Sequence, residues 1–207
     1  MTLRLAFVFA AAALFVAGPA AAHSNPAPKP TLPKLSEKEE ERLRGGKLVM
    51  TRQVADGAGA VTGLIEIAAT PEEVWKILVN FEGLPESTPS IKEVNRYTDS
   101  EVGGGHRVID IGYMLKVAWV EIRYWVHHDY FPEKQYLVWN LDAAKPNEIA
   151  ATTGSFSTWP GSAPGKTRYL YVTSVDTGRS VPDWVEEDLT ESSLKKYMKF
   201  VKQKAEK

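Results

Sequence analysis

"TPEEVWKILVNFEGLPESTPSIKEV", residues 70–94, has the pattern of a capped helix that stops abruptly and gives way to a strand. Thr70 is a typical N-cap, Pro71 follows at the first helical position, and two glutamates occupy the first turn, where the helix dipole favours carboxylates. A glycine and two prolines end the pattern. At helical spacing, the apolar stripe consists of Val74, Trp75, Leu78 and Phe81. The fold must therefore accommodate one early helix among segments that otherwise alternate like strands.

Alternating apolar and polar residues predict strands on both sides of this helix. Two precede it, "KLVMTRQV" at 47–54 and "VTGLIEIA" at 61–68, and the turn-rich "ADGAG" between them allows a hairpin or one bent edge. Six more are predicted after it, separated by Gly, Pro, Asn and Asp, as hairpin connections require. Their approximate bounds are 92–97, 107–117, 118–127, 135–141, 149–158 and 167–175.

From Val181 to the end of the chain, the period returns to that of a helix. Its apolar side carries Val185, Leu189, Tyr197 and Val201, and glutamates and lysines occupy the other side. This order of elements predicts an α+β fold, in which an antiparallel sheet carries its helices on one face. The sheet must curve around the final helix to cover its apolar side, and a cavity can open where the two do not touch.

The first 22 residues have the features of a secretory signal peptide. Arg4 precedes an apolar run, and an A-x-A arrangement follows that ends at Ala22. The run is shorter than the ~20 apolar residues that span a bilayer. We therefore expect cleavage near Ala22/His23 and a secreted or periplasmic protein.

Residues 23–46 are predicted to form a Pro-rich extended tether and then a short charged helix. Ser36 is the expected N-cap, Glu39 its capping-box partner and Gly45 the stop. The remainder, residues 47–207, has a length that suits one domain.

The composition narrows the classes of function. The chain has no cysteine, which excludes disulfides and thiolate metal sites, so an exported fold must be stabilised by its core. The formal net charge is -1, so the chain lacks the excess of basic residues that is typical of nucleic-acid-binding proteins, and nucleic acid is not expected as a partner.

Several short motifs connect the chain with a known superfamily. The early helix contains A-x-P-E-x-V-W followed by F-x-x-x-P, and the later matching segments are "LVWNLD", "GSFS", "TRYLYV" and "VPDW". On these residues, the stretch from Lys47 to Lys207 resembles the START-like (SRPBCC) superfamily, the helix-grip group that includes polyketide cyclase/dehydrase-like and coenzyme Q-binding proteins. The resemblance implies that the early helix and its Pro-broken continuation interrupt the sheet after its first strands and cap one end of it. Fold does not fix activity, so the function needs a separate argument.

Inward-facing apolar and aromatic residues define the expected ligand cavity. The predicted lining is Trp75, Leu78, Phe81, Ile109, Ile111, Tyr113, Val120, Ile122, Tyr124, Trp139, Phe156, Tyr169, Tyr171, Trp184, Val185 and Leu189. Ordinary core packing is compatible with the same residues.

Strand alternation also predicts which face of the sheet carries the polar residues of these strands. If the apolar set faces inward, Asp110 and His106 lie on the other face, and Glu121 and Arg123 form a solvated pair. With the opposite parity, these four residues would converge inside as an acid-base site. Asp110, Glu121 and Arg123 are therefore the candidate polar anchors for a ligand.

Other motifs do not support a catalytic residue, a metal or a cofactor. His127 and His128 are neighbours on a strand, so they point to opposite faces and cannot bind one metal. "GSAPGKT" at 161–167 lacks the first glycine of a phosphate loop and precedes a strand, which indicates a hairpin loop, although the longer "STWPGSAPGKT" could serve as a lid. At a mature N-terminus, His23 could bind copper, but coincidence of processing explains it better.

These observations predict a carrier for a hydrophobic small molecule such as a sterol-like or hopanoid lipid, a quinone or a fatty-acyl lipid. We expect a monomer that contacts a membrane or a loading partner transiently. The alternative is a cyclase or dehydrase acting on a polyketide-like aromatic compound, which needs ionisable residues facing the cavity. A third alternative is a domain that binds a protein partner through an apolar patch near Trp159 and Trp184.

Overall fold

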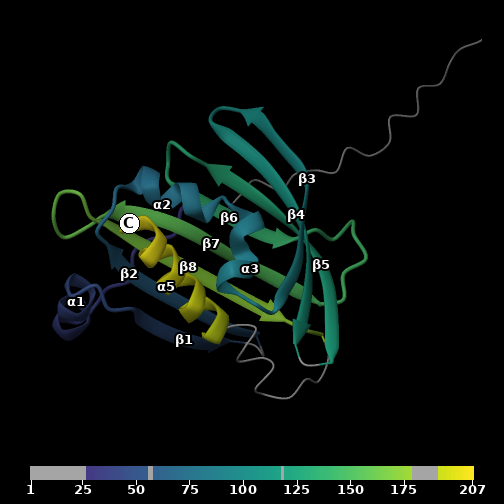
Figure 1. The fold of residues 1–207 in the computed structure, drawn as a ribbon, viewed down its shortest axis with the longest axis horizontal. Coiled ribbons are helices and arrows are strands. Elements are labelled where there is room, and N and C mark those ends of the chain that lie inside the picture. Colours follow the sequence, from purple (N-terminus) through teal and green to yellow (C-terminus); the bar gives the residue numbers. More distant parts are fainter. Residues whose placement is uncertain (1–26, 56–57, 118, 179–190) are drawn as a thin grey trace, which may run out of the picture.

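A computed structural model of the chain describes residues 27–55, 58–117, 119–178 and 191–207 (Figure 1). The predicted signal peptide and its cleavage point lie outside these ranges. So do the first part of the predicted terminal helix and three predicted lining residues, Trp184, Val185 and Leu189.

The described strands form one antiparallel sheet in the order β1-β2-β8-β7-β6-β5-β4-β3. The first two pair as a hairpin, from Val49 opposite Leu64 to Ala55 opposite Ala58, and β2 then pairs with the last strand. In sequence order the strands are β1 (Val49–Ala55), β2 (Ala58–Ile67), β3 (Ile91–Gly103), β4 (His106–Val117), β5 (Val120–Phe131), β6 (Tyr136–Leu141), β7 (Ala151–Pro160) and β8 (Thr167–Asp176). The predicted α+β class with a curved antiparallel sheet is confirmed.

The helices lie mainly on one side of this sheet. Figure 1 shows α2, α3 and α5 on its inner face, while α1 lies beside β1 and β2. Their bounds are α1 (Glu37–Arg44), α2 (Pro71–Leu78), the 3-10 turn η1 (Phe81–Gly83), α3 (Leu84–Ser87) and α5 (Ser193–Ala205). None of the helices in the described ranges has the length and apolar character needed to cross a bilayer.

Both predicted N-caps, Thr70 and Ser36, are present, and each forms a full capping box. The Thr70 hydroxyl accepts from the Glu73 amide, and the Glu73 carboxylate accepts from the Thr70 amide at 2.8 Å. Ser36 and Glu39 make the same exchange at the start of α1. Because these caps are local in sequence, they can be predicted without knowledge of the fold.

The early helix is shorter than its apolar stripe suggested. It ends at Leu78. Phe81 is also buried, but it belongs to the separate turn η1. The expected break contains one further helical turn, α3, with Pro85 near its start. This Pro is tolerated there because the first residues of a helix do not need their amide hydrogens.

The C-terminal helix lies very close to β2. A Cβ atom built on Gly63 would be 2.4 Å from Met198 Sδ and 2.7 Å from Leu194 Cδ2, so the missing side chain makes room for α5. Leu194, Tyr197, Met198 and Val201 are all buried in the same core. The apolar side of this amphipathic helix thus packs against the inner face of the sheet.

The Pro-rich segment is docked on the fold where it is described. Leu32 and Leu35 pack on a small cluster on the outer face that includes Leu43 and Leu170. Lys29 Nζ donates to the Lys134 carbonyl at 2.9 Å and the Thr158 carbonyl at 2.8 Å. This part of the predicted tether therefore covers the outer face of the sheet.

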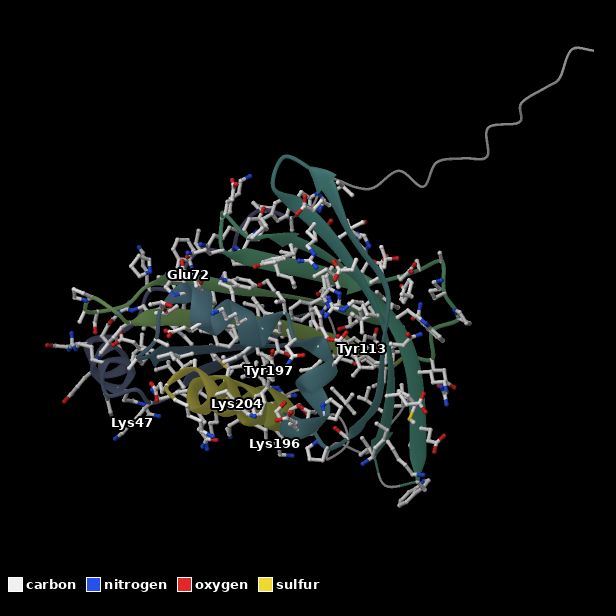
Figure 2. The ribbon with its side chains drawn as sticks, turned by 45° about the horizontal axis from the view of Figure 1, so that its top comes forward. Lys47, Glu72, Tyr113, Lys196, Tyr197 and Lys204 are labelled. Atoms are coloured by element: carbon white, nitrogen blue, oxygen red, sulfur yellow. The ribbon has the colours of Figure 1, made fainter. Side chains whose placement is uncertain are left out.

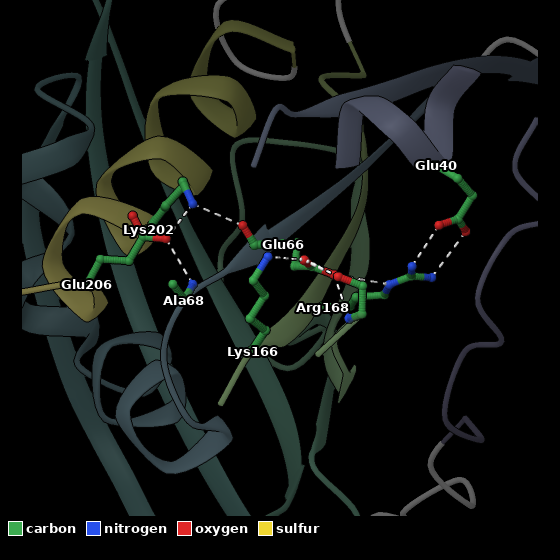
Figure 3. Close-up of polar contacts among 8 residues, drawn as sticks. Glu40, Glu66, Ala68, Lys166, Arg168, Lys202 and Glu206 are labelled. Atoms are coloured by element: carbon green, nitrogen blue, oxygen red, sulfur yellow. Dashed lines mark hydrogen bonds and ion pairs between the residues drawn. The ribbon is translucent and has the colours of Figure 1, made fainter. Parts of the chain in front are cut away.

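A buried carboxylate, Glu66 on β2, joins segments that are distant in sequence (Figure 3). It is 2% exposed and accepts from the Ser162 amide at 2.8 Å, the Ser162 hydroxyl at 2.7 Å and Lys166 Nζ at 3.0 Å. Arg168 lies 3.7 Å from the same carboxylate and makes a two-pronged ion pair with Glu40 of α1. Burial alone would raise the pKa of Glu66, but the hydrogen bonds from Ser162 and Lys166 outweigh it, so the pKa lies below its ordinary value.

The main chain of Glu66 also holds α5. Its carbonyl accepts from Lys202 Nζ at 3.0 Å, and Lys202 pairs with Glu206. The Glu206 carboxylate in turn accepts from the Ala68 amide at 2.8 Å. One short stretch of β2 therefore connects α1, the β7–β8 loop and the end of α5.

Replacing Glu66 with Ala should lower the free energy of unfolding by roughly 3–5 kcal/mol, because Lys166 and Arg168 would lose a buried partner. The matched control is Glu86→Ala, which breaks the ion pair with Lys204 at a glutamate whose side chain is 60% exposed. That change should cost about 0.5 kcal/mol or less. Urea unfolding followed by circular dichroism measures both values, and equal losses would contradict the role given to Glu66.

Candidate functional site

A cavity of about 120 Å³ lies between the inner face of the sheet, α3 and α5. Aromatic rings, aliphatic side chains and a few hydroxyl groups surround it. Figure 2 shows Tyr113 of β4 and Tyr197 of α5 on this inner side, with Lys196 and Lys204 pointing away from the sheet. The lining is Phe81, Leu84, Thr88, Ile91, Tyr113, Leu115, Tyr124, Val126, His128, Trp139, Thr152, Phe156, Tyr171, Thr173, Val175, Ser193 and Tyr197.

Strand alternation decides which side chains reach the cavity. On β4 the odd-numbered residues Tyr113 and Leu115 face it, and on β5 the even-numbered residues Tyr124, Val126 and His128 do so. The registers Tyr113 opposite Tyr124 and Leu115 opposite Ile122 bring the two inward sets side by side. The inward parity predicted from the sequence agrees with this arrangement.

Four aromatic rings form one wall of the cavity. Trp139 makes edge contacts with Phe156 at 5.1 Å and Tyr171 at 5.8 Å between ring centroids, and Tyr197 of α5 lies 5.7 Å from Phe156. Gly154 makes room for the indole, since a Cβ there would lie 2.1 Å from Trp139 Cζ2. These rings provide a wide apolar surface of the kind that small-molecule sites use.

His128 is the ionisable imidazole in this lining. It is 3% exposed, and its Nδ1 lies 2.9 Å from the carbonyl oxygen of Ile109. The ring of Phe81 is 4.7 Å away between centroids. Burial lowers the pKa of His128 to about 4, although the hydrogen bond to Ile109 opposes this, so the imidazole is neutral at physiological pH.

His127, the preceding residue, has the opposite environment on the outer face. Its Nδ1 lies 2.7 Å from Asp110 and its Nε2 3.5 Å from Asp129, which also contacts His106 at 2.7 Å. Hydrogen bonds to Asp110 and Asp129 raise the pKa of His127 to about 10. The imidazolium therefore balances two carboxylates on the side of the sheet that faces away from the cavity.

The structure divides the predicted lining into two groups. Six residues line the cavity: Phe81, Tyr113, Tyr124, Trp139, Phe156 and Tyr171. Seven others lie in or against the hydrophobic core instead: Trp75, Leu78, Ile109, Ile111, Val120, Ile122 and Tyr169. Trp75, for example, stacks on Tyr130 at 5.0 Å and donates from Nε1 to Thr158 at 2.8 Å.

The three candidate polar anchors do not reach the cavity. Asp110 lies on the outer face with His127, Glu121 pairs with Lys116 at 3.1 Å, and Arg123 pairs with Glu93 at 3.3 Å. The four residues that the opposite parity would have brought together therefore do not converge inside. The loop at 161–166 also contributes nothing to the described lining, and its Ser162 binds Glu66.

Sequence reasoning missed the polar part of the lining. Thr88, His128, Thr152, Thr173 and Ser193 were not recognised. Three of them, His128, Thr152 and Thr173, lie on strands, where polar residues are usually assigned to the solvent side. For His128 the signal was present, since it continues the inward parity of Tyr124 and Val126.

Among the described lining residues there is no Asp, Glu, Lys or Arg. The described ranges also contain no group of three or more His, Asp or Glu residues arranged to hold a metal.

The family described as polyketide cyclase / dehydrase and lipid transport matches residues 58–204, which is most of the chain. The chain belongs to this family. Among curated proteins no sequence matches it. The family binds hydrophobic small molecules in a cavity, which agrees with the position and lining of the site.

Solved structures show the same fold. The STAR-related lipid transfer protein from Xanthomonas axonopodis superimposes with a TM-score of 0.58 at 14% identity, covering 86% of this chain and 98% of that one. A START superfamily protein from Mycobacterium smegmatis gives 0.56 at 19% identity, with coverages of 71% and 97%. The Zhui aromatase/cyclase from Streptomyces sp. R1128 gives 0.55 at 18% identity, with coverages of 72% and 94%. The START-like, helix-grip assignment is thereby confirmed, and identities this low show fold alone.

The two neighbouring histidines should titrate far apart, near pH 4 for His128 and near pH 10 for His127. The pKa of His128 lies below the ordinary 6.5, so its contribution to stability should be lost as the pH falls from about 6.5 towards 4. The pKa of His127 lies above 6.5, so its contribution should be fully present below that pH and lost as the pH rises towards 10. Imidazole nitrogen shifts followed by NMR measure both, and two midpoints near 6.5 would contradict the assigned environments.

Proposed function

We propose that this protein binds a hydrophobic small molecule in the cavity between the sheet and α5 and carries it without chemical change. The observation that carries the proposal is the lining itself, which is rich in aromatic rings and has no charged side chain among its described residues. A cavity of this kind suits a ligand that is mostly apolar with a small polar part.

The alternative, a cyclase or dehydrase acting on a polyketide-like compound, has less support. General acid-base catalysis needs an ionisable group within hydrogen-bond reach of the substrate. Asp110, Glu121 and Arg123 lie on the other face or at the surface, and His128 is a neutral ring whose pKa of about 4 makes it a weak base. The similarity to the Zhui aromatase/cyclase is one of fold, so it does not transfer that activity.

The size of the cavity bears on which ligands fit. Typical ligand sites have volumes of about 300–1,000 Å³, and a cavity of about 150 Å³ is enough for benzene. The space of about 120 Å³ is smaller than both, so even a single ring would need the lining side chains to adjust. A sterol-like or hopanoid lipid, a quinone or a fatty-acyl chain would require the lining to open further.

The proposal includes export, since the predicted signal peptide would place the protein in an aqueous compartment where such ligands are poorly soluble. All of the described lining residues belong to one chain, so the proposal takes the protein to be a monomer. Loading would require contact with a membrane or a partner protein. The exposed lysines Lys195, Lys199 and Lys204 on α5 are suited to approach anionic lipid headgroups.

Native mass spectrometry of residues 23–207, purified gently from the native compartment, tests the proposal. We expect a discrete added mass that is lost on denaturation. Leu115→Trp should abolish the added mass, because Leu115 lines the cavity and the larger ring would fill it. Lys116→Trp is the matched control, since the neighbouring side chain is exposed on the opposite face.

Protein that is consistently bare, and that takes up no lipid from a total extract, would refute the carrier function. Retention of the added mass in Leu115→Trp would move the binding site away from this cavity.

A further inference from the structure

His128 determines the hydrogen-bonding character of the cavity. Its Nδ1 lies 2.9 Å from the Ile109 carbonyl oxygen, and a carbonyl oxygen can only accept, so the hydrogen must be on Nδ1. In a neutral imidazole the other nitrogen, Nε2, is then an acceptor with a free lone pair. The hydrogen bond to the main chain of β4 therefore determines that Nε2, and not Nδ1, is available to a ligand.

No hydrogen bond reaches Nε2 from the described part of the chain, although His128 is almost fully buried and borders the cavity. The ring is held in place by Phe81 at 4.7 Å and Trp139 at 6.2 Å between centroids. Nε2 is not among the fully enclosed atoms that lack a partner, so it is accessible from the cavity, where a ligand hydroxyl can donate to it.

The charge of the site restricts what can donate. The described lining contains no cation to pair with a carboxylate or phosphate and no anion to pair with an ammonium group. Burial keeps His128 neutral, and it raises the pKa of Tyr113 and Tyr124 so that both hydroxyls stay protonated. A charged ligand group would therefore lose its hydration without compensation.

We propose that the cavity selects a neutral ligand whose hydroxyl group, phenolic or alcoholic, donates a hydrogen bond to Nε2 of His128. This inference rests on the proposed function, because it names the chemistry of the ligand that the cavity would hold. It favours a lipid alcohol or a hydroquinone over an ionised fatty acid. His128 is thus a specificity-determining residue, whereas His127 on the outer face is not.

Three single-ring probes test this directly: p-cresol, toluene and p-toluate. They share one ring and one methyl group, and they differ in carrying a hydroxyl, a hydrogen or a carboxylate. Titration of the mature chain, followed by amide chemical shifts in NMR, gives the three dissociation constants. We expect p-cresol to bind about three- to tenfold more tightly than toluene, and p-toluate to bind at least about tenfold more weakly than p-cresol.

Variants assign the preference to one nitrogen. His128→Phe keeps a ring and removes the acceptor, so p-cresol and toluene should bind with equal affinity. His128→Gln offers a carbonyl acceptor and should keep part of the preference. His127→Gln is the matched control on the opposite face and should keep all of it. The amide spectrum of each variant shows whether the fold is intact, and the comparison of probes on the unaltered protein does not depend on any variant.

The possible results distinguish the role of His128 from ligand binding in the cavity. Equal binding of p-cresol and toluene to the unaltered protein, or a preference that survives in a folded His128→Phe, would overturn the role of His128 and leave ligand binding in the cavity intact. Tight binding of p-toluate would overturn the selection for neutral ligands. If none of the probes binds, the cavity is not a ligand site, and the proposed function falls together with this inference.

Discussion

The close contact between α5 and β2 at Gly63 determines how the rest of the molecule is arranged. Because Gly63 has no side chain, Leu194 and Met198 approach the sheet directly at this strand. The sheet then curves away from the helix towards β5 and β4, and the space that opens is lined by rings from β6, β7 and β8. Close packing on one strand and a gap beside it are therefore two results of the same geometry.

Alternation along the strands separates the two chemical environments of the sheet. His127 and His128 are adjacent, yet one is an imidazolium between two carboxylates and the other is a neutral ring in an aromatic wall. Their pKa values of about 10 and about 4 differ because one side chain gains charged partners and the other loses its hydration. A shift of register by one residue would exchange the two sets, so the pairing of β4 with β5 is essential to the character of the cavity.

Local features of the sequence predicted most of the fold. The caps at Ser36 and Thr70 and the period-two strands depend on near neighbours, and the structure confirms them. The extension of β3 to Gly103 was missed, because this edge strand is exposed and polar beyond Tyr97. The cavity could be predicted only in part, since Tyr169 in the core and Tyr171 at the cavity are the same type of residue at the same parity. Which of them borders empty space depends on the distance to α5, and no local pattern records that distance.

The ion pairs around Glu66 have a mechanical consequence for α5. The helix is fixed near its C-terminal end, where Lys202 binds the Glu66 carbonyl and Glu206 binds the Ala68 amide. Its other end, at Ser193, borders the cavity about 14 Å away along the axis. Leu194, next to Ser193, and Met198 pack against Gly63, so α5 is held by polar contacts at its C-terminal end and by close packing near the cavity. Widening the cavity by moving α5 would therefore disturb either the packing at Gly63 or the polar contacts at the C-terminal end of the helix.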